Sequence, residues 1–321
     1  MGETHHPETR HAEIKPAPKR GAKRSPFWRF LPFWLPAFLV YTLFVVWPLL
    51  NALLYSLFEW QGLRRGAFVG LGNFVRLFST EPWRSDLAAA FGHNVVFFVG
   101  TMLLQNTVAL VFALIIFSLR RGGRFWQNLF FMPHLLATVV VGFLWNLILN
   151  PLFGPLNQGL KLLGLGALAQ PWLGQPETAL PTIIAVNAWA WLGFPMMIFL
   201  ANLGSIPPSY TEAARLDGAN SWHVFRHIQL PLLRPALTIV TLLTFIGNFN
   251  TFELVFVMAG SNGSPGGATD VLGTLFYRTA FGGGQDAVSM GSALAVVMFA
   301  FIALTSFTVL RLFRQETVVY D

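Results

Sequence analysis

Six residues in the later apolar part of the chain have side chains suited to holding a small polar molecule. They are Trp189 and Trp191 in one apolar segment, and Asn248, Asn250, Phe252 and Glu253 in the next. Amides both donate and accept hydrogen bonds, and aromatic rings stack on the faces of sugars, so this set suits a neutral, hydroxyl-rich solute. The same amides can instead hydrogen-bond between helices, which is common in membrane bundles. Both interpretations remain open from the sequence.

The polar stretch between these two segments, residues 205–231, predicts a short helix and a turn. Pro208 stops the preceding helix. Ser209 and Glu212 have the spacing of a capping box, in which each side chain bonds the other residue's backbone N–H. Gly218 permits a positive φ and therefore turns the chain after the helix.

A second short helix follows the turn and has a large apolar face. Asn220 or Ser221 is placed to cap its start, and Pro231 is expected to close it. The unit is therefore a helix–turn–helix that presents three large apolar side chains: Leu216, Trp222 and Phe225.

Three interpretations of this helix–turn–helix are possible. It is an amphipathic connector resting on lipid headgroups, a DNA-binding motif, or a docking element for another protein. DNA binding is disfavoured because only Arg215, Arg226 and Arg234 supply positive charge and apolar segments flank the unit directly. Its apolar face is too large for a plain connector, which favours docking.

Neither catalysis nor ATP binding is indicated by the residues. The sequence contains no Gly-x-x-x-x-Gly-Lys-Ser/Thr motif, and its only lysines are Lys15, Lys19, Lys23 and Lys161. No cluster has the spacing of a metal site or of an acid–base pair, so we predict no catalytic residue, no metal and no cofactor in this chain. Any ATP-driven step would need another chain.

The composition of the chain predicts that the segments holding these residues lie in a membrane. The chain is 54% hydrophobic and only 11% charged, whereas a soluble domain carries about 25% charged residues. Six apolar segments each reach the length of about 20 residues that a membrane helix needs. They lie at about 31–58, 91–118, 127–149, 179–203, 233–259 and 289–312. Prolines inside them, including Pro36, Pro48, Pro133 and Pro195, predict kinks.

The distribution of Lys and Arg predicts the orientation. With the N-terminus in the cytoplasm, the cytoplasmic segments hold 15 Lys and Arg residues and the outer loops hold 6. Both termini are then cytoplasmic, and so is the loop 204–232. Residues 1–26 are basic, rich in Pro and His and without periodicity, which predicts a disordered cytoplasmic tail before a membrane domain, 27–321. The first outer loop, 59–90, is long enough for a small folded cap.

Several stretches now resemble a known family. Glu212-Ala213-Ala214, Asp217-Gly218-Ala219 and Ile228-Gln229-Leu230-Pro231 match the EAA loop of binding-protein-dependent ABC importer permeases, in the version of the carbohydrate (maltose/glycerol-phosphate-type) branch. The resemblance covers most of residues 30–312. Val69-Gly70-Leu71-Gly72-Asn73-Phe74 is similar to a segment of that family's first outer loop. Residues 252–281 are similar to one of the two paired sugar permeases, with Glu253 in place of the usual Asp.

The resemblance implies an all-α membrane protein with six transmembrane helices, a type I ABC importer permease-like bundle with a cytoplasmic coupling helix. It also implies a bacterial inner-membrane permease subunit for a sugar, either a mono- or oligosaccharide or a related polyol or sugar phosphate. The implied partners are a second homologous permease, a cytoplasmic ABC ATPase dimer that binds ATP and Mg²⁺, and an extracytoplasmic solute-binding protein. Nucleic acid is not among them. The residues implied in ATPase coupling are Ser209, Glu212, Ala213, Ala214, Asp217, Gly218, Ala219, Trp222, Phe225 and Pro231.

The alternative function is an ion-coupled secondary sugar carrier. Such carriers usually hold several carboxylates within the membrane and often show inverted repeats. Only Glu253 lies near the end of a predicted span, so this alternative is disfavoured.

Overall fold

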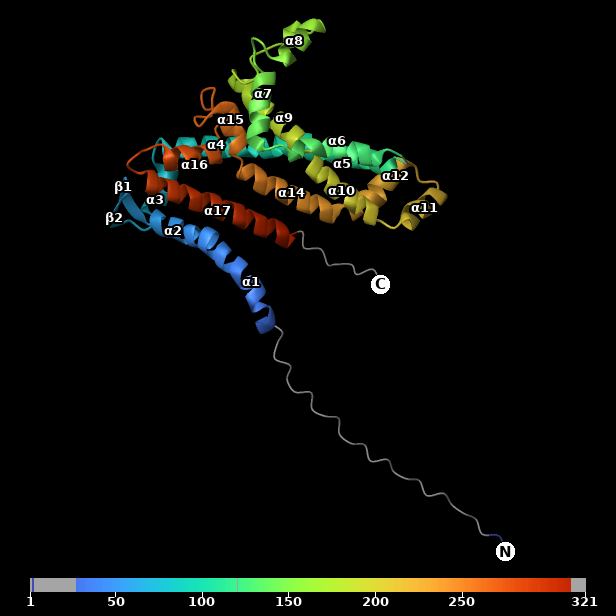
Figure 1. The fold of residues 1–321 in the computed structure, drawn as a ribbon, viewed down its shortest axis with the longest axis horizontal. Helices are drawn as coiled ribbons and strands as arrows, with labels where there is room; N and C mark the ends of the chain where they lie inside the picture. Colours follow the sequence, from blue (N-terminus) through green and yellow to red (C-terminus); the bar gives the residue numbers. More distant parts are fainter. Residues whose placement is uncertain (1, 3–26, 120, 313–321) are drawn as a thin grey trace. The chain divides into compact units, whose positions relative to one another are not determined.

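The computed structural model describes residue 2, residues 27–119 and residues 121–312, and over these residues one β-hairpin is the only regular secondary structure that is not helical (Figure 1). Apart from residue 2, the predicted tail 1–26 lies outside the described residues, as do residues 313–321. The chain divides into two compact units, residues 1–50 and residues 51–321. The candidate sites all lie in the second unit.

The first unit holds the start of one long apolar helix. Its elements are α1 (Phe27–Tyr41), a π-helical turn (Thr42–Val46) and the beginning of α2 (Trp47–Ser56). From Pro32 to Ser56 the helix is long and apolar enough to cross a bilayer. Pro36 lies inside α1 without ending it.

The second unit opens with a folded cap, as the length of the first loop predicted. An antiparallel hairpin, β1 (Phe58–Gln61) and β2 (Arg64–Phe68), is followed by α3 (Gly72–Ser79). Asn73 is buried, and its Nδ2 donates to the carbonyls of Ser56 (2.8 Å) and Phe58 (2.9 Å). This amide therefore joins the end of α2 to the hairpin and to α3.

The cap is bonded to the start of the last helix, α17 (Ala287–Leu312). Trp60 N donates to Ser289 Oγ (2.8 Å), Gly62 N donates to Gln285 O (2.9 Å), and Arg76 pairs with Asp286 (2.6 Å). These contacts join segments that are far apart in the sequence.

Among the described residues, three helices are long and apolar enough to span a membrane alone, and three bent pairs bring the total to six if each pair is one span. The single helices are Pro32–Ser56, Trp83–Ser118 and Ala287–Arg311. Trp83–Ser118 comprises α4 (Trp83–Thr101), a π-helical turn (Met102–Asn106) and α5 (Thr107–Ser118). Within the second unit, α14 (Arg234–Phe249) packs on both α4 and α17 (Figure 1).

Two of the bent pairs break close to predicted proline kinks. The first comprises α6 (Gly123–Phe131), a 3₁₀ turn (Met132–Leu135) and α7 (Thr138–Ile148), and it bends by 94° just after Pro133. The second comprises α9 (Pro176–Trp191) and α10 (Gly193–Ser205), bends by 46°, and has Pro195 in the first turn of α10. Proline removes a backbone donor, so a helix bends readily beside it.

The predicted fifth span, 233–259, is not one helix. The third bent pair joins the segment Ser221–Leu232 to α14 (Arg234–Phe249) at 65°, and α14 ends at Phe249. A short link then leads to a separate helix, α15 (Glu253–Ala259). Asn250 Nδ2 donates to Ile246 O (2.9 Å), and such side-chain bonds to nearby carbonyls compete with helix continuation.

The remaining elements connect these spans. They are α8 (Pro155–Leu162), a 3₁₀ turn (Gly166–Leu168) and α16 (Leu272–Phe281). Three apolar clusters form the core, and each joins different helices. In one, Ala109 and Ala113 of α5 lie with Phe199 of α10, because small residues let helices approach closely.

Candidate functional site

The first helix of the predicted docking loop is α11 (Pro208–Leu216), and it is not capped as predicted. Pro207 precedes it in the N-cap position and makes no side-chain cap bond, while Pro208 fills the first helical position. Proline has its φ already set for that position and lacks an N–H that would go unpaired. The helix therefore starts two residues earlier than the capping box requires, and Ser209 and Glu212 both lie within it. The predicted Ser209–Glu212 box is wrong.

The turn after α11 forms as predicted at Gly218. Its φ is +85°, and its N–H donates to Arg215 O (3.1 Å). The next N–H, that of Ala219, donates to Ala214 O (2.9 Å). These two bonds make a Schellman motif, which satisfies carbonyls at the helix end and favours glycine at this position.

Asn220 caps the second helix, which was one of the two predicted alternatives, Asn220 and Ser221. Its Oδ1 accepts from His223 N (2.9 Å) at the start of α12 (Ser221–Val224). The helical segment continues through a π turn (Phe225–Gln229) and α13 (Leu230–Leu232). Pro231 was expected to close the unit, but it lies inside this segment, in the first turn of α13. The bend comes only after Leu232, where α14 begins.

Two of the three predicted apolar side chains of the loop are open. Leu216 is 90% exposed and Trp222 is 64% exposed, whereas Phe225 is half-buried with its ring 5.5 Å from that of Trp222. Glu212, Ala213 and Asp217 are also exposed, whereas Ala214 and Ala219 are half-buried. An exposed patch of large apolar side chains rimmed by carboxylates has the character of an interaction surface.

A cavity of about 500 Å³ collects most of the other predicted set. Trp191, Asn248, Asn250, Phe252 and Glu253 line it, and Trp189 does not. Trp189 instead lies with its ring 5.4 Å from that of Trp145, in an edge-on contact. The role of the five lining residues in binding a solute stays a prediction.

The cavity forms where the helices break. Thr138 follows the break before α7, Trp191 and Phe194 flank the break between α9 and α10, and residues 250–252 are the link after α14. Irregular backbone at membrane depth is tolerated where it lines a cavity.

Two buried amide atoms in the cavity wall have no hydrogen-bond partner among the described residues. They are Asn248 Nδ2, a donor, and Gln105 Oε1, an acceptor, and both residues are about 5% exposed. An unpaired buried amide atom is costly, so a polar group in the cavity is favoured. Five polar lining residues were missed from the sequence, namely Gln105, Thr138, Asn187, Thr244 and Thr251. Residue type alone does not show which face of its helix each of these residues occupies.

Other amides in the spans bond between helices, as the alternative interpretation held. Asn106 Nδ2 donates to Thr244 Oγ1 (2.9 Å), and Asn146 Nδ2 donates to Val257 O (2.9 Å). Asn94 Nδ2 donates to Asn248 O (2.7 Å). The interpretation as bonds between helices therefore holds for these three amides, and solute binding by the cavity-lining residues stays a prediction.

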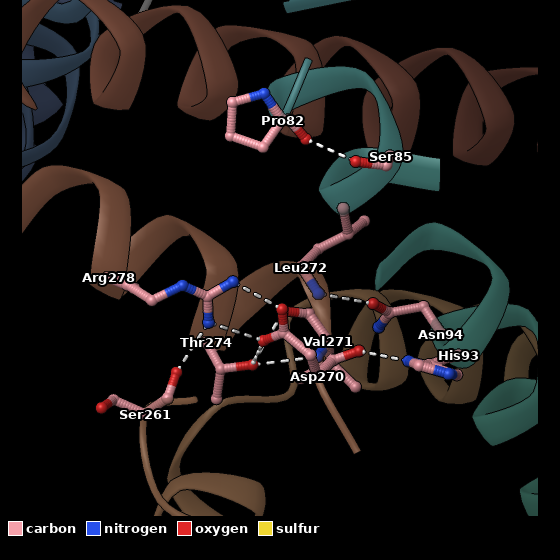
Figure 2. A network of polar contacts seen from close by, with 10 residues as sticks. All are labelled: Pro82, Ser85, His93, Asn94, Ser261, Asp270, Val271, Leu272, Thr274 and Arg278. Atoms are coloured by element: carbon pink, nitrogen blue, oxygen red, sulfur yellow. Dashed lines mark hydrogen bonds and ion pairs between the residues drawn. The ribbon is translucent and has the colours of Figure 1, made fainter. Parts of the chain in front are cut away.

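A polar network adjoins the cavity at Asn248 and is drawn in Figure 2. Arg278 forms a two-pronged ion pair with Asp270, with Nη1–Oδ1 at 3.1 Å and Nη2–Oδ2 at 2.7 Å. Thr274 Oγ1 also donates to Asp270 Oδ1 (2.7 Å). The hydrogen bonds that Arg278 donates to the Asp270 carboxylate raise the pKa of Arg278, so its guanidinium stays charged.

The family model described as binding-protein-dependent transport system inner membrane component matches residues 105–318. The chain belongs to this family. The match includes the docking loop, the cavity-lining residues and the Asp270–Arg278 part of the network, so the resemblance noted from residues 212–231 is confirmed at the level of the family.

Relatives of this permease chain support the same placement. It is 31% identical over 290 residues to the probable starch degradation products transport system permease protein AmyD of Thermoanaerobacterium thermosulfurigenes, covering 89% of this chain and 95% of that protein. It is 30% identical over 288 residues to the trehalose/maltose transport system permease protein MalF of Thermococcus litoralis, covering 88% and 93%.

A solved structure shows the fold. A chain of a bacterial ABC transporter involved in the import of the acidic polysaccharide alginate superposes with a TM-score of 0.77 at 23% identity, covering 90% of this permease chain and 96% of that chain. The predicted fold class, an all-α type I permease bundle, is therefore confirmed.

Proposed function

We propose that this permease is the channel-forming subunit of an ATP-driven importer that carries a sugar, as a mono- or oligosaccharide or related polyol, across the bacterial inner membrane. The observation that carries the proposal is the cavity at the helix breaks. It combines an unpaired amide donor, an unpaired amide acceptor and the Trp191 ring. Sugars offer hydroxyls that both donate and accept, together with apolar faces that pack on aromatic rings.

The relatives' names point to the same class of solute. They describe transport of starch degradation products, of trehalose and maltose, and of lactose. A cavity volume of about 500 Å³ lies within the range of small-molecule sites.

Energy for the transport would come from a separate ATPase dimer that binds ATP and Mg²⁺, because this sequence has no P-loop. The open face around Leu216, Trp222 and the exposed carboxylate of Glu212 is the surface proposed to dock it. A second permease and an extracytoplasmic solute-binding protein complete the proposed complex, with both termini of this chain in the cytoplasm. One solved relative is a bacterial alginate ABC transporter in complex with an alginate-pentasaccharide-bound periplasmic protein.

The test is uptake of radiolabelled maltose, trehalose and lactose by the assembled complex in proteoliposomes. Uptake is expected to require ATP inside the vesicle and to be unaffected by a proton ionophore. Uptake driven by an ion gradient without ATP would instead support the ion-coupled carrier, with Glu253 as its carboxylate in the cavity.

A single residue tests the cavity. Asn248→Leu removes the unpaired donor and is expected to raise the KM for the transported sugar about tenfold, the worth of one hydrogen bond. The matched control is Asn202→Leu, because Asn202 Nδ2 donates to Ile198 O of its own helix, away from the cavity. An unchanged KM in Asn248→Leu, or an equal change in both variants, would count against the cavity as the solute site.

A further inference from the structure

Asn94 joins three elements with one side chain. It lies in α4, is completely buried, and uses both ends of its amide. Its Oδ1 accepts from Leu272 N at the start of α16 (2.8 Å), and its Nδ2 donates to Asn248 O at the end of α14 (2.7 Å), as Figure 2 shows in part. One residue of α4 therefore fixes both the loop that precedes α16 and the wall of the cavity.

The loop 260–271, which leads into α16, is folded tightly on itself. Arg278 pairs with Asp270 and also donates from Nη1 to Ser261 O (2.8 Å), so it joins the two ends of the loop. A Cβ added to Gly263, whose φ is +60°, would collide with the backbone of Asp270. Because these contacts hold the loop together, a displacement of the loop would move Leu272 N with it.

His93 adds a second contact between α4 and the loop. Its Nδ1 lies 2.7 Å from Asp270 O. A carbonyl oxygen only accepts, so Nδ1 carries the proton and donates. Two successive residues of α4 thus hold the end of the loop and the start of α16: His93 bonds Asp270, and Asn94 bonds Leu272, the residue directly after the loop. Of these two, only Asn94 also bonds a residue of the cavity wall.

On the cavity side, Asn94 sets the position of the last turn of α14. The carbonyl of Asn248 is one of the final carbonyls of that helix, which lack partners further along it. Its bond from Asn94 is 2.7 Å, whereas its contact from Thr251 N is 3.3 Å. The same residue lines the cavity, and its side-chain Nδ2 is buried without a hydrogen-bond partner among the described residues.

We propose that Asn94 is a positioning residue that couples the loop 260–271 to the cavity. A macromolecular partner that displaces the loop changes the placement of Asn248 through Asn94. By reciprocity, a solute bound at Asn248 biases the position of the loop. The identity of the solute and of the partner rests on the proposed function, but the coupling between the two places does not.

The experiment measures how fast a cysteine in the cavity lining reacts while the loop is perturbed. The chain has no cysteine, so a single Thr251→Cys in the cavity lining serves as reporter for the rate of maleimide labelling in the detergent-solubilised complex. The loop is perturbed by Thr274→Val, which removes the hydroxyl bonded to Asp270, or by Gly263→Ala. Each loop change is expected to alter the labelling rate about fivefold, within the usual range of coupling between sites.

In a chain that also carries Asn94→Leu, the loop changes are expected to have no effect. The labelling rate of Thr251→Cys with a loop change, divided by the rate without it, should then be about one. Asn94→Asp is the second variant, because it keeps the acceptor for Leu272 N and loses only the donor to Asn248 O. Asn146→Leu is the matched control: it removes a comparable amide-to-carbonyl bond between α7 and α15 and should leave the fivefold effect intact.

A purely structural role for Asn94 would shift all labelling rates together and leave the loop dependence in place. That result, or loop changes without effect in the parent chain, would overturn the proposal. Labelling needs no transported sugar, so an importer that fails to take up maltose, trehalose or lactose leaves this test readable.

Discussion

At the scale of single residues, Gly218 is the position whose backbone the docking loop most depends on. Its φ of +85° lies in the region where a residue with a Cβ costs about 1–2 kcal/mol. The side chain itself has room, because an added Cβ would meet nothing within 4 Å. Gly218→Val is therefore expected to disturb the turn through the backbone alone. ATP-driven sugar uptake should fall several-fold, while the amount of protein inserted in the membrane stays the same.

Gly218→Asn is the control for this prediction, since asparagine tolerates a left-handed backbone better than other residues with a Cβ. It should keep most of the uptake. Glu212→Lys tests the same loop without touching the turn, because its side chain is exposed and reverses charge on the docking face. Normal coupled uptake in both Gly218→Val and Glu212→Lys would contradict a role of this loop in energy coupling.

Residue-level prediction succeeded where local chemistry decides. The turn at Gly218 and the cap at Asn220 depend on a few neighbouring backbone groups, and both form as predicted. The Ser209 capping box failed because two local rules competed, and Pro208 at the first helical position won. Trp189 and Gln105 show the limit. Gln105 lines the cavity and Trp189 does not, because each helix is rotated so that only one of its faces borders the cavity. A single sequence does not show how neighbouring helices are rotated relative to one another.

At the scale of elements, the ion pair Arg278–Asp270 is the strongest polar link within the 260–281 region. The side chain of Asp270 is 9% exposed and that of Arg278 is 30% exposed. Arg278→Met leaves a buried carboxylate without its cation, which typically costs about 3–5 kcal/mol. The partial exposure of Arg278 lowers the expected loss of unfolding free energy to about 2–4 kcal/mol. The thermal unfolding midpoint of the purified permease measures this loss.

Arg76→Met is the matched control, because Arg76 also pairs with an aspartate, at 2.6 Å, but both side chains are more than a third exposed. An exposed pair contributes about 0–1 kcal/mol, so its loss should shift the midpoint little. The double variant Arg278→Met with Asp270→Leu should recover part of the stability by removing the orphaned charge. If Arg278→Met and Arg76→Met lowered the thermal unfolding midpoint equally, burial of Asp270 would not explain the stability that its ion pair contributes.

The presence of a helical span was easier to predict from the sequence than the residues at which its helices begin, bend and end. Apolar runs located all six candidate spans, because lipid demands long unbroken stretches of apolar side chains. The break after Phe249 was not visible as such, since apolar residues continue on both sides of it. Pro133 and Pro195 did signal the other two breaks that border the cavity, because proline marks a bend directly.

At the scale of the whole molecule, the arrangement predicts which loops share one side of the membrane. The cap is bonded to residues 285–289, and the loop 260–271 is bonded to α16, directly before them. The docking loop lies at the other end of α14, whose 16 residues span about 24 Å. The cap and the loop 260–271 should therefore face one side of the membrane, and the docking loop the other.

Cysteine labelling in intact spheroplasts tests this orientation, because the native chain contains no cysteine to interfere. A membrane-impermeant maleimide should label Leu63→Cys in the cap and Asn262→Cys in the loop, both of which are exposed. Ser205→Cys, at the end of α10, should react only after the membrane is permeabilised. The distribution of 15 and 6 basic residues supports this direction, because positive charge favours the cytoplasm. Labelling of Ser205→Cys in intact spheroplasts would place the docking loop away from any cytoplasmic ATPase, and the proposed energy coupling would fall with it.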